Sequence, residues 1–157
     1  MLRSSSAPAK VASGIVRNAR IAVIRAEYNA EITESLERKC LETLRESGVS
    51  VDCFTVPGCL EIPIFAQRLA RRRRYDVMIA LGAVIRGDTH HFELVASECA
   101  RGIMEVSLKY NVPIIFEVLA VYRRRDAVAR AGNNARNKGV EAANAALSML
   151  SKIHGLA

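Results

Sequence analysis

The segment from Ala83 to Glu93, which reads AVIRGDTHHFE, holds the densest group of residues that could do chemistry. Gly87 allows the backbone to turn so that its N–H groups meet an anion, and Thr89 adds a hydroxyl donor. A helix predicted after this segment would present its N-terminus to the same place. The glycine spacing and Lys-Ser/Thr ending of a nucleotide phosphate loop are absent from the sequence, and so is GxGxxG. The segment therefore predicts a small phosphate-binding turn.

Two adjacent histidines, His90 and His91, stand at the end of this turn. They make a poor metal pair, because neighbouring residues on an extended loop point to opposite sides and no third ligand is near in the sequence. A histidine in a loop is more often structural or solvated than catalytic. Beside a phosphate-binding turn, however, an imidazole is well placed to move protons near neutral pH. Proton transfer by a histidine of this pair is therefore a hypothesis, and no metal site is predicted.

The other predicted loops contain residues with two possible interpretations. Tyr28 could stack on a planar ligand or only cover the edge of a sheet. Glu61 could support a helix dipole or accept hydrogen bonds from the hydroxyls of a polyol. Arg130 and Lys138 are most simply solvated charges, but together with the turn they would form a cationic pocket for one phosphate.

The elements that must position these residues follow from the apolar pattern. Short apolar runs rich in β-branched residues predict four buried strands, at 20–26, 49–56, 76–82 and 113–119. Apolar residues at helical spacing predict four helices, at 31–47, 62–72, 93–109 and 138–153. This alternation indicates an open, doubly wound α/β domain with four parallel strands and helices on both faces. In such sheets ligands bind at the carboxyl ends of the strands.

Length and composition narrow the class of protein further. The chain has 157 residues and is 50% hydrophobic, which suits a single domain at 15–157 preceded by a flexible tail at 1–14. Its four cysteines form no CxxC pair, which argues against a zinc site or a disulfide framework and favours a reducing, cytoplasmic setting. Its apolar runs are too short for a membrane span.

The net charge of +7 at first suggests an anionic partner. Two arginine runs, Arg71–Arg74 and Arg123–Arg125, carry as many charges as this excess, and neither lies in a predicted ligand-binding motif. The first run ends a predicted helix, lacks interleaved aromatic residues and belongs to a chain without tryptophan. We therefore expect solvated charge there, and neither a nucleic-acid partner nor a membrane partner.

Three motifs in this order and spacing resemble the lumazine synthase family: VPGCLEIP at 56–63, ALGAVIRGDTHHFELV at 80–95 and RAGNNARNKGVEAA at 130–143. The resemblance runs from about Arg20 to the C-terminus and implies a flavodoxin-like fold. It also implies a condensation without a cofactor, in which 5-amino-6-(D-ribitylamino)uracil and L-3,4-dihydroxy-2-butanone 4-phosphate give 6,7-dimethyl-8-ribityllumazine. This is the penultimate step of riboflavin biosynthesis.

The resemblance also implies a role for each residue that matches a family motif. His91 matches the catalytic histidine, whereas His90 occupies a variable position. The residues that would bind the aminouracil substrate are Tyr28, Cys59, Leu60, Glu61, Ala83, Val84, Ile85 and Phe116. The residues that would bind the butanone phosphate are Asp88, Thr89, Arg130 and Lys138. Within these sets, those implied to act from a neighbouring subunit are Phe116, Arg130 and Lys138.

An oligomer is the further implication. The resemblance implies an obligate homopentamer, and the short segment 132–138 is compatible with a 60-subunit icosahedral shell. Riboflavin synthase is then a candidate partner, and the N-terminal segment is a candidate for adding a strand to a neighbouring subunit.

The chain also departs from the family pattern. Glu117 stands where Gly or Asn is common, Leu60 where a larger aromatic residue is frequent, and AVYRRRDA at 120–127 replaces a Thr-Thr stretch. A binding module that has kept the pocket as a sensor or carrier is the alternative to an enzyme. The intact set of polar residues, His91 included, argues against lost catalysis.

Overall fold

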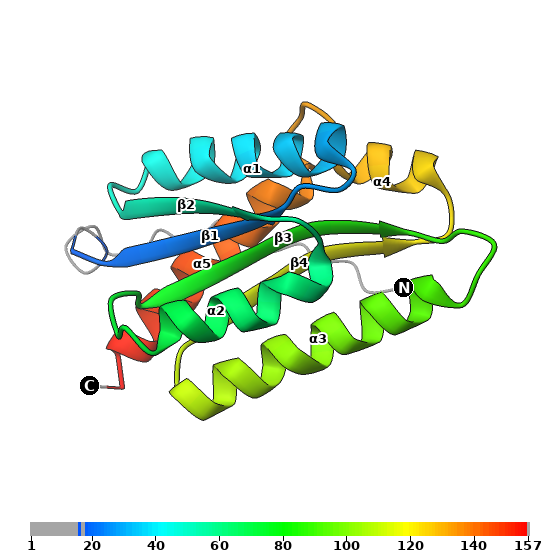
Figure 1. Ribbon diagram of the computed structural model, residues 1–157. Helices are drawn as coiled ribbons and strands as arrows, with labels where there is room; N and C mark the ends of the chain where they lie inside the picture. Colours follow the sequence, from blue (N-terminus) through cyan, green and yellow to red (C-terminus); the bar gives the residue numbers. More distant parts are fainter. Residues whose placement is uncertain (1–15, 17, 157) are drawn as a thin grey trace.

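The computed structural model describes residues 16 and 18–156, which form one parallel sheet of four strands in the order β2-β1-β3-β4 (Figure 1). The strands are β1 (Arg20–Ala26), β2 (Ser50–Val56), β3 (Val77–Ile85) and β4 (Ile114–Val121). β1 and β3 occupy the centre and are almost wholly buried, as continuous apolar runs require. The predicted open, doubly wound α/β arrangement is confirmed. The predicted tail at 1–14, and any strand it adds to a neighbour, lie outside the described residues.

Helices cover both faces of the sheet, and each face has its own apolar core. Figure 1 shows α1 (Ala30–Arg45) and α4 (Arg124–Arg130) on one side, with α2 (Ile62–Ala70) and α3 (His91–Tyr110) on the other. The long C-terminal helix α5 (Lys138–His154) packs with α1, in the core on the side of the sheet that α1 and α4 cover. The buried face of α3 consists of Val95, Cys99, Ile103 and Val106, which recur at helical spacing in the sequence. Among residues 16 and 18–156, no helix is long and apolar enough to cross a membrane.

The end of β3 differs from its predicted position. The strand continues past Gly82 to Ile85, because Ala83 and Ile85 pair with Leu119 and Val121 of β4. Ala83, Val84 and Ile85 are therefore strand residues rather than loop residues, and the loop before α3 begins only at Arg86. The phosphate-binding turn is consequently short and starts from a fixed strand end.

Two short helices were not predicted. A 3-10 turn, η1, covers Cys59–Glu61 directly before α2. The second is α4, which takes up most of the arginine-rich segment after β4 and buries only Ala127. One buried alanine among exposed arginines leaves little helical periodicity in the sequence, which is why this helix is hard to predict. The run Arg71–Arg74 follows α2, at the helix end where it was expected, and is exposed.

Candidate functional site

The ends of β1 and β2 bring Tyr28 and Glu61 together around Gly58. The backbone N–H of Tyr28 donates to the Pro57 carbonyl at 3.2 Å, which fixes the loop after β1 against the loop after β2. A Cβ added at Gly58 would lie 3.0 Å from both Glu61 Oε2 and the Tyr28 ring. Glycine is therefore needed where the two side chains converge. The Tyr28 ring is 71% exposed, so its face is available to a planar ligand.

Cys59 lies beneath this pair, against the end of β3. A Cβ added at Gly82 would lie 2.6 Å from Cys59 Sγ, so the missing side chain of Gly82 makes room for the thiol. Burial raises the pKa of the Cys59 thiol to about 11, although a backbone hydrogen bond with Ala83 lowers it in part. The thiol is thus neutral at physiological pH and shapes the site rather than acting as a nucleophile.

Asn29 contributes a contact at the end of β3 that sequence reasoning missed. Its side-chain Nδ2 donates to the Ala83 carbonyl at 2.9 Å. Asn29 has a left-handed backbone, with φ 59°, directly before α1. Asparagine tolerates this conformation better than most residues, and that preference is the only signal the sequence offered. The residue ties the loop after β1 to the strand that leads into the phosphate-binding turn.

The turn between β3 and α3 is exposed and carries its polar groups outward. The Arg86 N–H donates to the Val121 carbonyl at 2.9 Å, so the sheet ladder continues into the first residue of the turn. The Thr89 hydroxyl oxygen accepts a long hydrogen bond, 3.5 Å, from the His91 backbone N–H. A Cβ at Gly87 would meet no atom within 4 Å, so this position stands in open space. A short, exposed turn before a long helix is the geometry that anion binding requires.

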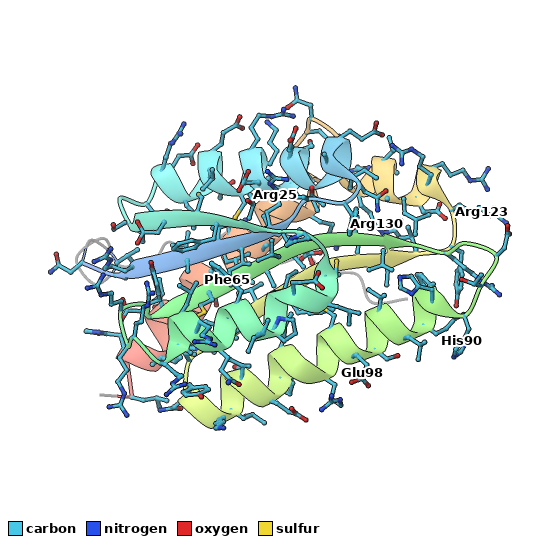
Figure 2. All side chains as sticks on the ribbon, in the orientation of Figure 1. Arg25, Phe65, His90, Glu98, Arg123 and Arg130 are labelled. Atoms are coloured by element: carbon cyan, nitrogen blue, oxygen red, sulfur yellow. The ribbon has the colours of Figure 1, made fainter. Side chains whose placement is uncertain are left out.

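The two histidines differ in their surroundings. His90 lies where the turn enters α3 (Figure 2), and its Nδ1 is 3.5 Å from Glu93 Oε2, an oxygen that is buried and lacks a hydrogen bond in the described structure. His91 begins α3 and is exposed. Within residues 16 and 18–156, no hydrogen bond or ion pair engages the His91 imidazole. Its side chain can therefore meet a ligand at the turn without breaking an existing contact.

Phe116, Arg130 and Lys138 lie on two faces of the sheet. Phe116 stands on the edge strand β4, pairs with Ala80 in the register and shares its face with α2 and α3, where it is 41% exposed. Arg130 ends α4 on the other face and donates from Nη1 to the Asp126 carbonyl at 2.9 Å. Lys138 begins α5 on that same face. Among the described residues, no hydrogen bond or ion pair joins any of the three to the turn at 86–91.

Glu117 is a carboxyl group in an apolar position. It pairs with Leu81 in the register, so it faces the core of α1 and α5. Burial raises the pKa of Glu117 to about 7. The positive charge of Lys138 lowers this pKa, whereas the negative charge of Glu141 raises it. Lys138 itself forms an ion pair with Glu141. The carboxyl group is therefore largely neutral below neutral pH.

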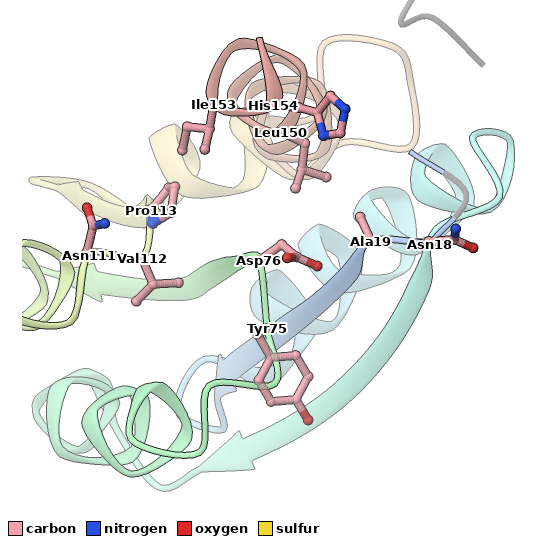
Figure 3. Close-up of a pocket in the computed structure, with 10 residues that line it drawn as sticks. All are labelled: Asn18, Ala19, Tyr75, Asp76, Asn111, Val112, Pro113, Leu150, Ile153 and His154. Atoms are coloured by element: carbon pink, nitrogen blue, oxygen red, sulfur yellow. The ribbon is translucent and has the colours of Figure 1, made fainter. Parts of the chain in front are cut away.

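A cavity of about 540 Å³ lies at the opposite edge of the sheet, near the amino ends of the strands (Figure 3). Its lining comes from the segments that precede β1, β3 and β4 and from the end of α5; the residues are Asn18, Ala19, Tyr75, Asp76, Asn111, Val112, Pro113, Leu150, Ile153 and His154. None of the predicted site residues contributes to it. The candidate site is instead an open edge of the chain, with Leu60, Glu61, Asp88 and Thr89 exposed.

An open parallel sheet with helices on both faces and its polar loops at the carboxyl ends of the strands defines a flavodoxin-like α/β protein. Within that class, the family model of 6,7-dimethyl-8-ribityllumazine synthase matches residues 18–154. The match takes in well over half of the chain, and the chain belongs to this family. Its members are enzymes of riboflavin synthesis, in agreement with the resemblance of the three sequence motifs.

Proposed function

We propose that this protein is a lumazine synthase. It condenses 5-amino-6-(D-ribitylamino)uracil with L-3,4-dihydroxy-2-butanone 4-phosphate and releases 6,7-dimethyl-8-ribityllumazine, inorganic phosphate and two waters, the penultimate step of riboflavin biosynthesis. The observation that carries this proposal is the family match over residues 18–154. The reaction moves protons and eliminates phosphate without a redox step, so it needs no cofactor, and we place it in the cytoplasm.

The aminouracil substrate would bind at the ends of β1, β2 and β3. Tyr28 would stack on the pyrimidine ring, since its exposed face lies beside Glu61 across Gly58. Glu61 would accept hydrogen bonds from the ribityl hydroxyls, next to Cys59 and Leu60 of the same 3-10 turn. The last residues of β3, which are Ala83, Val84 and Ile85, would meet the edge of the uracil.

The butanone phosphate would bind at the turn that follows β3. Asp88 and Thr89 would place backbone and hydroxyl groups around the phosphate, and Arg130 and Lys138 would supply positive charge. His91 would act as general acid and base, since its exposed imidazole stands at the end of the same turn. The aryl amine adds to the ketone, phosphate leaves by elimination, and ring closure with dehydration completes the product.

The complete site would require a second copy of the chain. In the described residues no hydrogen bond or ion pair joins Phe116, Arg130 or Lys138 to the turn at 86–91, so a second copy is the source of these residues that we propose. We propose that a neighbouring subunit supplies Phe116, Arg130 and Lys138 in a homopentamer. The large apolar side chains that α2 and α3 leave exposed suit such packing: Ile64, Leu94, Met104 and Leu108. Twelve pentamers could then form a 60-subunit shell, with riboflavin synthase as a partner.

The test is to mix purified protein with both substrates and to follow lumazine absorbance together with phosphate release. We expect formation of one phosphate per lumazine at a rate well above that of the substrates in buffer alone. Light scattering on the same sample separates a pentamer from a monomer and from a shell. A rate equal to that of buffer would exclude the enzyme and leave a ligand-binding module.

A further inference from the structure

The side chains of Arg86, Phe92 and Tyr122 form a cluster beside the candidate phosphate-binding turn. The Arg86 guanidinium lies over the Tyr122 ring, with its carbon 5.4 Å from the ring centroid. The Phe92 ring lies on the same tyrosine, with centroids 5.9 Å apart and an angle of 41° between the planes. Tyr122 is thus a platform that contacts one residue at each end of the turn, although 69% of it is exposed.

The two contacts of Tyr122 join parts of the chain that are firmly held. Arg86 is fixed by its backbone hydrogen bond to Val121, which continues the pairing of β3 with β4. Phe92, in the first turn of α3, packs against the core between the sheet and α2 and α3. The Tyr122 ring spans the gap between these two anchors. Figure 1 shows that the β3–α3 loop and the β4–α4 connection lie at the same end of the molecule.

The residues between these two anchors make few contacts with the rest of the described structure. Gly87 stands in open space, and the hydrogen bond from the His91 N–H to Thr89 is long, at 3.5 Å. Asp88 and Thr89 are exposed. The path of the turn is therefore determined mainly by its two ends, and the Tyr122 ring connects those ends directly. This ring belongs to the segment 120–127, which departs from the family pattern.

We propose that Tyr122 is a positioning residue that holds the turn at 86–91 in the conformation that binds the phosphate of the substrate. The proposal rests on the proposed function for the identity of that phosphate. The ring acts through its cation–π contact with Arg86 and its tilted contact with Phe92, and the hydroxyl group is dispensable. Tyr122 acts through the turn and does not touch the reacting atoms.

The test compares Tyr122→Ala with Tyr122→Phe, which keeps the ring and removes only the hydroxyl. In steady-state kinetics we expect Tyr122→Ala to raise KM for the butanone phosphate about threefold to tenfold, the size of effect that loss of such ring contacts produces. KM for the aminouracil substrate should change far less, and Tyr122→Phe should match the wild type in both constants.

Hydrogen exchange supplies a readout that does not depend on activity. The backbone amides of Arg86 and His91, which donate hydrogen bonds in the described structure, should exchange faster in Tyr122→Ala than in the wild type, and Tyr122→Phe should keep the wild-type rate. Arg86→Gln, which removes the guanidinium from the ring, should accelerate exchange in the same residues. Circular dichroism and light scattering check that each variant is folded and assembled.

The outcomes separate this inference from the proposed function. If wild-type protein forms no lumazine but exchange depends on the ring as expected, the proposed function fails and the positioning of the turn stands. If wild-type protein is active and Tyr122→Ala leaves both the exchange of the Arg86 and His91 amides and KM for the butanone phosphate unchanged, the inference about Tyr122 is overturned. It is equally overturned if Tyr122→Phe behaves like Tyr122→Ala, because the hydroxyl would then be the essential group.

Discussion

At the scale of single residues, the candidate site has an exposed imidazole, that of His91, whereas nearby thiols are buried. His91 is exposed at the start of α3, and nothing in the described structure engages its imidazole. Cys59 and Cys99 are buried, and burial raises the pKa of Cys59 to about 11 and that of Cys99 to about 12. Both thiols stay neutral at physiological pH. Among these groups, the imidazole is the one suited to the proton transfer that the proposed function requires.

We expect His91→Ala to slow turnover by about a hundredfold, near the lower end of what general acid–base catalysis contributes. Activity should remain measurable, because an amine and a ketone condense in water without help and the remaining residues still hold both substrates close together. The measurement is kcat with both substrates saturating. His90→Ala is the matched control and should retain most of the activity. An unchanged kcat in His91→Ala would remove this histidine from the mechanism.

At the scale of elements, the packing of α5 on α1 depends on one glycine. Gly139 is buried in the first turn of α5, and a Cβ at this position would lie 2.0 Å from the backbone oxygen of Leu36 in α1. Asn137 caps the helix by accepting the Gly139 N–H at 2.7 Å. The start of α5 is therefore fixed both by its cap and by direct contact between two backbones.

Gly139→Ala should destabilise the fold by about 3 kcal/mol, the upper range for overpacking a well-filled core, since a backbone cannot yield as a flexible side chain does. Gly155→Ala is the matched control: a Cβ there would lie 3.5 Å from its nearest neighbour, which is ordinary contact. We expect this variant to stay within about 0.5 kcal/mol of the wild type. Urea unfolding followed by circular dichroism measures both, and equal midpoints for the two variants would contradict the prediction.

The sequence predicted the elements best where one face is buried. In α1 the residues at helical spacing, Ile32, Leu36, Cys40 and Leu44, are all buried, so the apolar pattern and burial coincide there. At Gly82 the same reasoning failed. The predicted strand ended at Gly82, whereas the structure places this glycine inside β3, where it makes room for the Cys59 thiol. A glycine required by tertiary contact cannot be told from a turn glycine by its neighbours in sequence.

Parts of the candidate site could not be predicted from the sequence either. Tyr28 and Glu61 could be singled out because they follow predicted strands, and they do converge. The bond from Asn29 to Ala83 and the ring of Tyr122 on Arg86 join segments 54 and 36 residues apart. No local sequence pattern predicts either contact.

At the scale of the whole molecule, the chain leaves an incomplete edge. The ends of β1, β2 and β3 and the turn after β3 lie at one edge of the sheet, whereas Phe116 stands on β4 and Arg130 ends α4 on the other face. Large apolar side chains remain exposed on α3, among them Met104 and Leu108 at 60% and 75%. Such a surface suits packing against another copy of the chain.

Mixing two inactive variants tests this arrangement. His91→Ala and Arg130→Ala, unfolded together in equal amounts and refolded, should regain about a quarter of the wild-type activity, because a random ring joins an intact His91 half to an intact Arg130 half at that frequency. Each variant refolded alone is the control and should stay well below this level. Mixed samples no more active than the average of the two variants would place the whole site in one chain.

The partly buried Glu117 carboxyl makes the stability of the fold depend on pH. Its pKa is raised to about 7 in the folded protein from 4.5, so the unfolded chain binds fewer protons between these values. Stability from this group is fully present below about pH 4.5 and is lost as the pH rises through about 7.

Glu117→Gln removes this dependence. We expect the variant to exceed the wild type by about 1 to 2 kcal/mol at pH 8, allowing for partial access of solvent to the carboxyl group. At pH 4.5 the two should be nearly equal. Urea unfolding at both values provides the measurement, and an equal difference at both pH values would show that Glu117 does not titrate on folding.

The separation of Phe116 and Arg130 from the turn also has a genetic consequence under the proposed assembly. Two alleles that damage different halves of the site would complement each other in one cell, since mixed rings would contain some intact sites. A single allele that damages one half would leave the output of its healthy counterpart unchanged, because each defective chain still supplies the intact other half of the site to its neighbour. The pattern of complementation between alleles would then show which residues of the site come from different subunits.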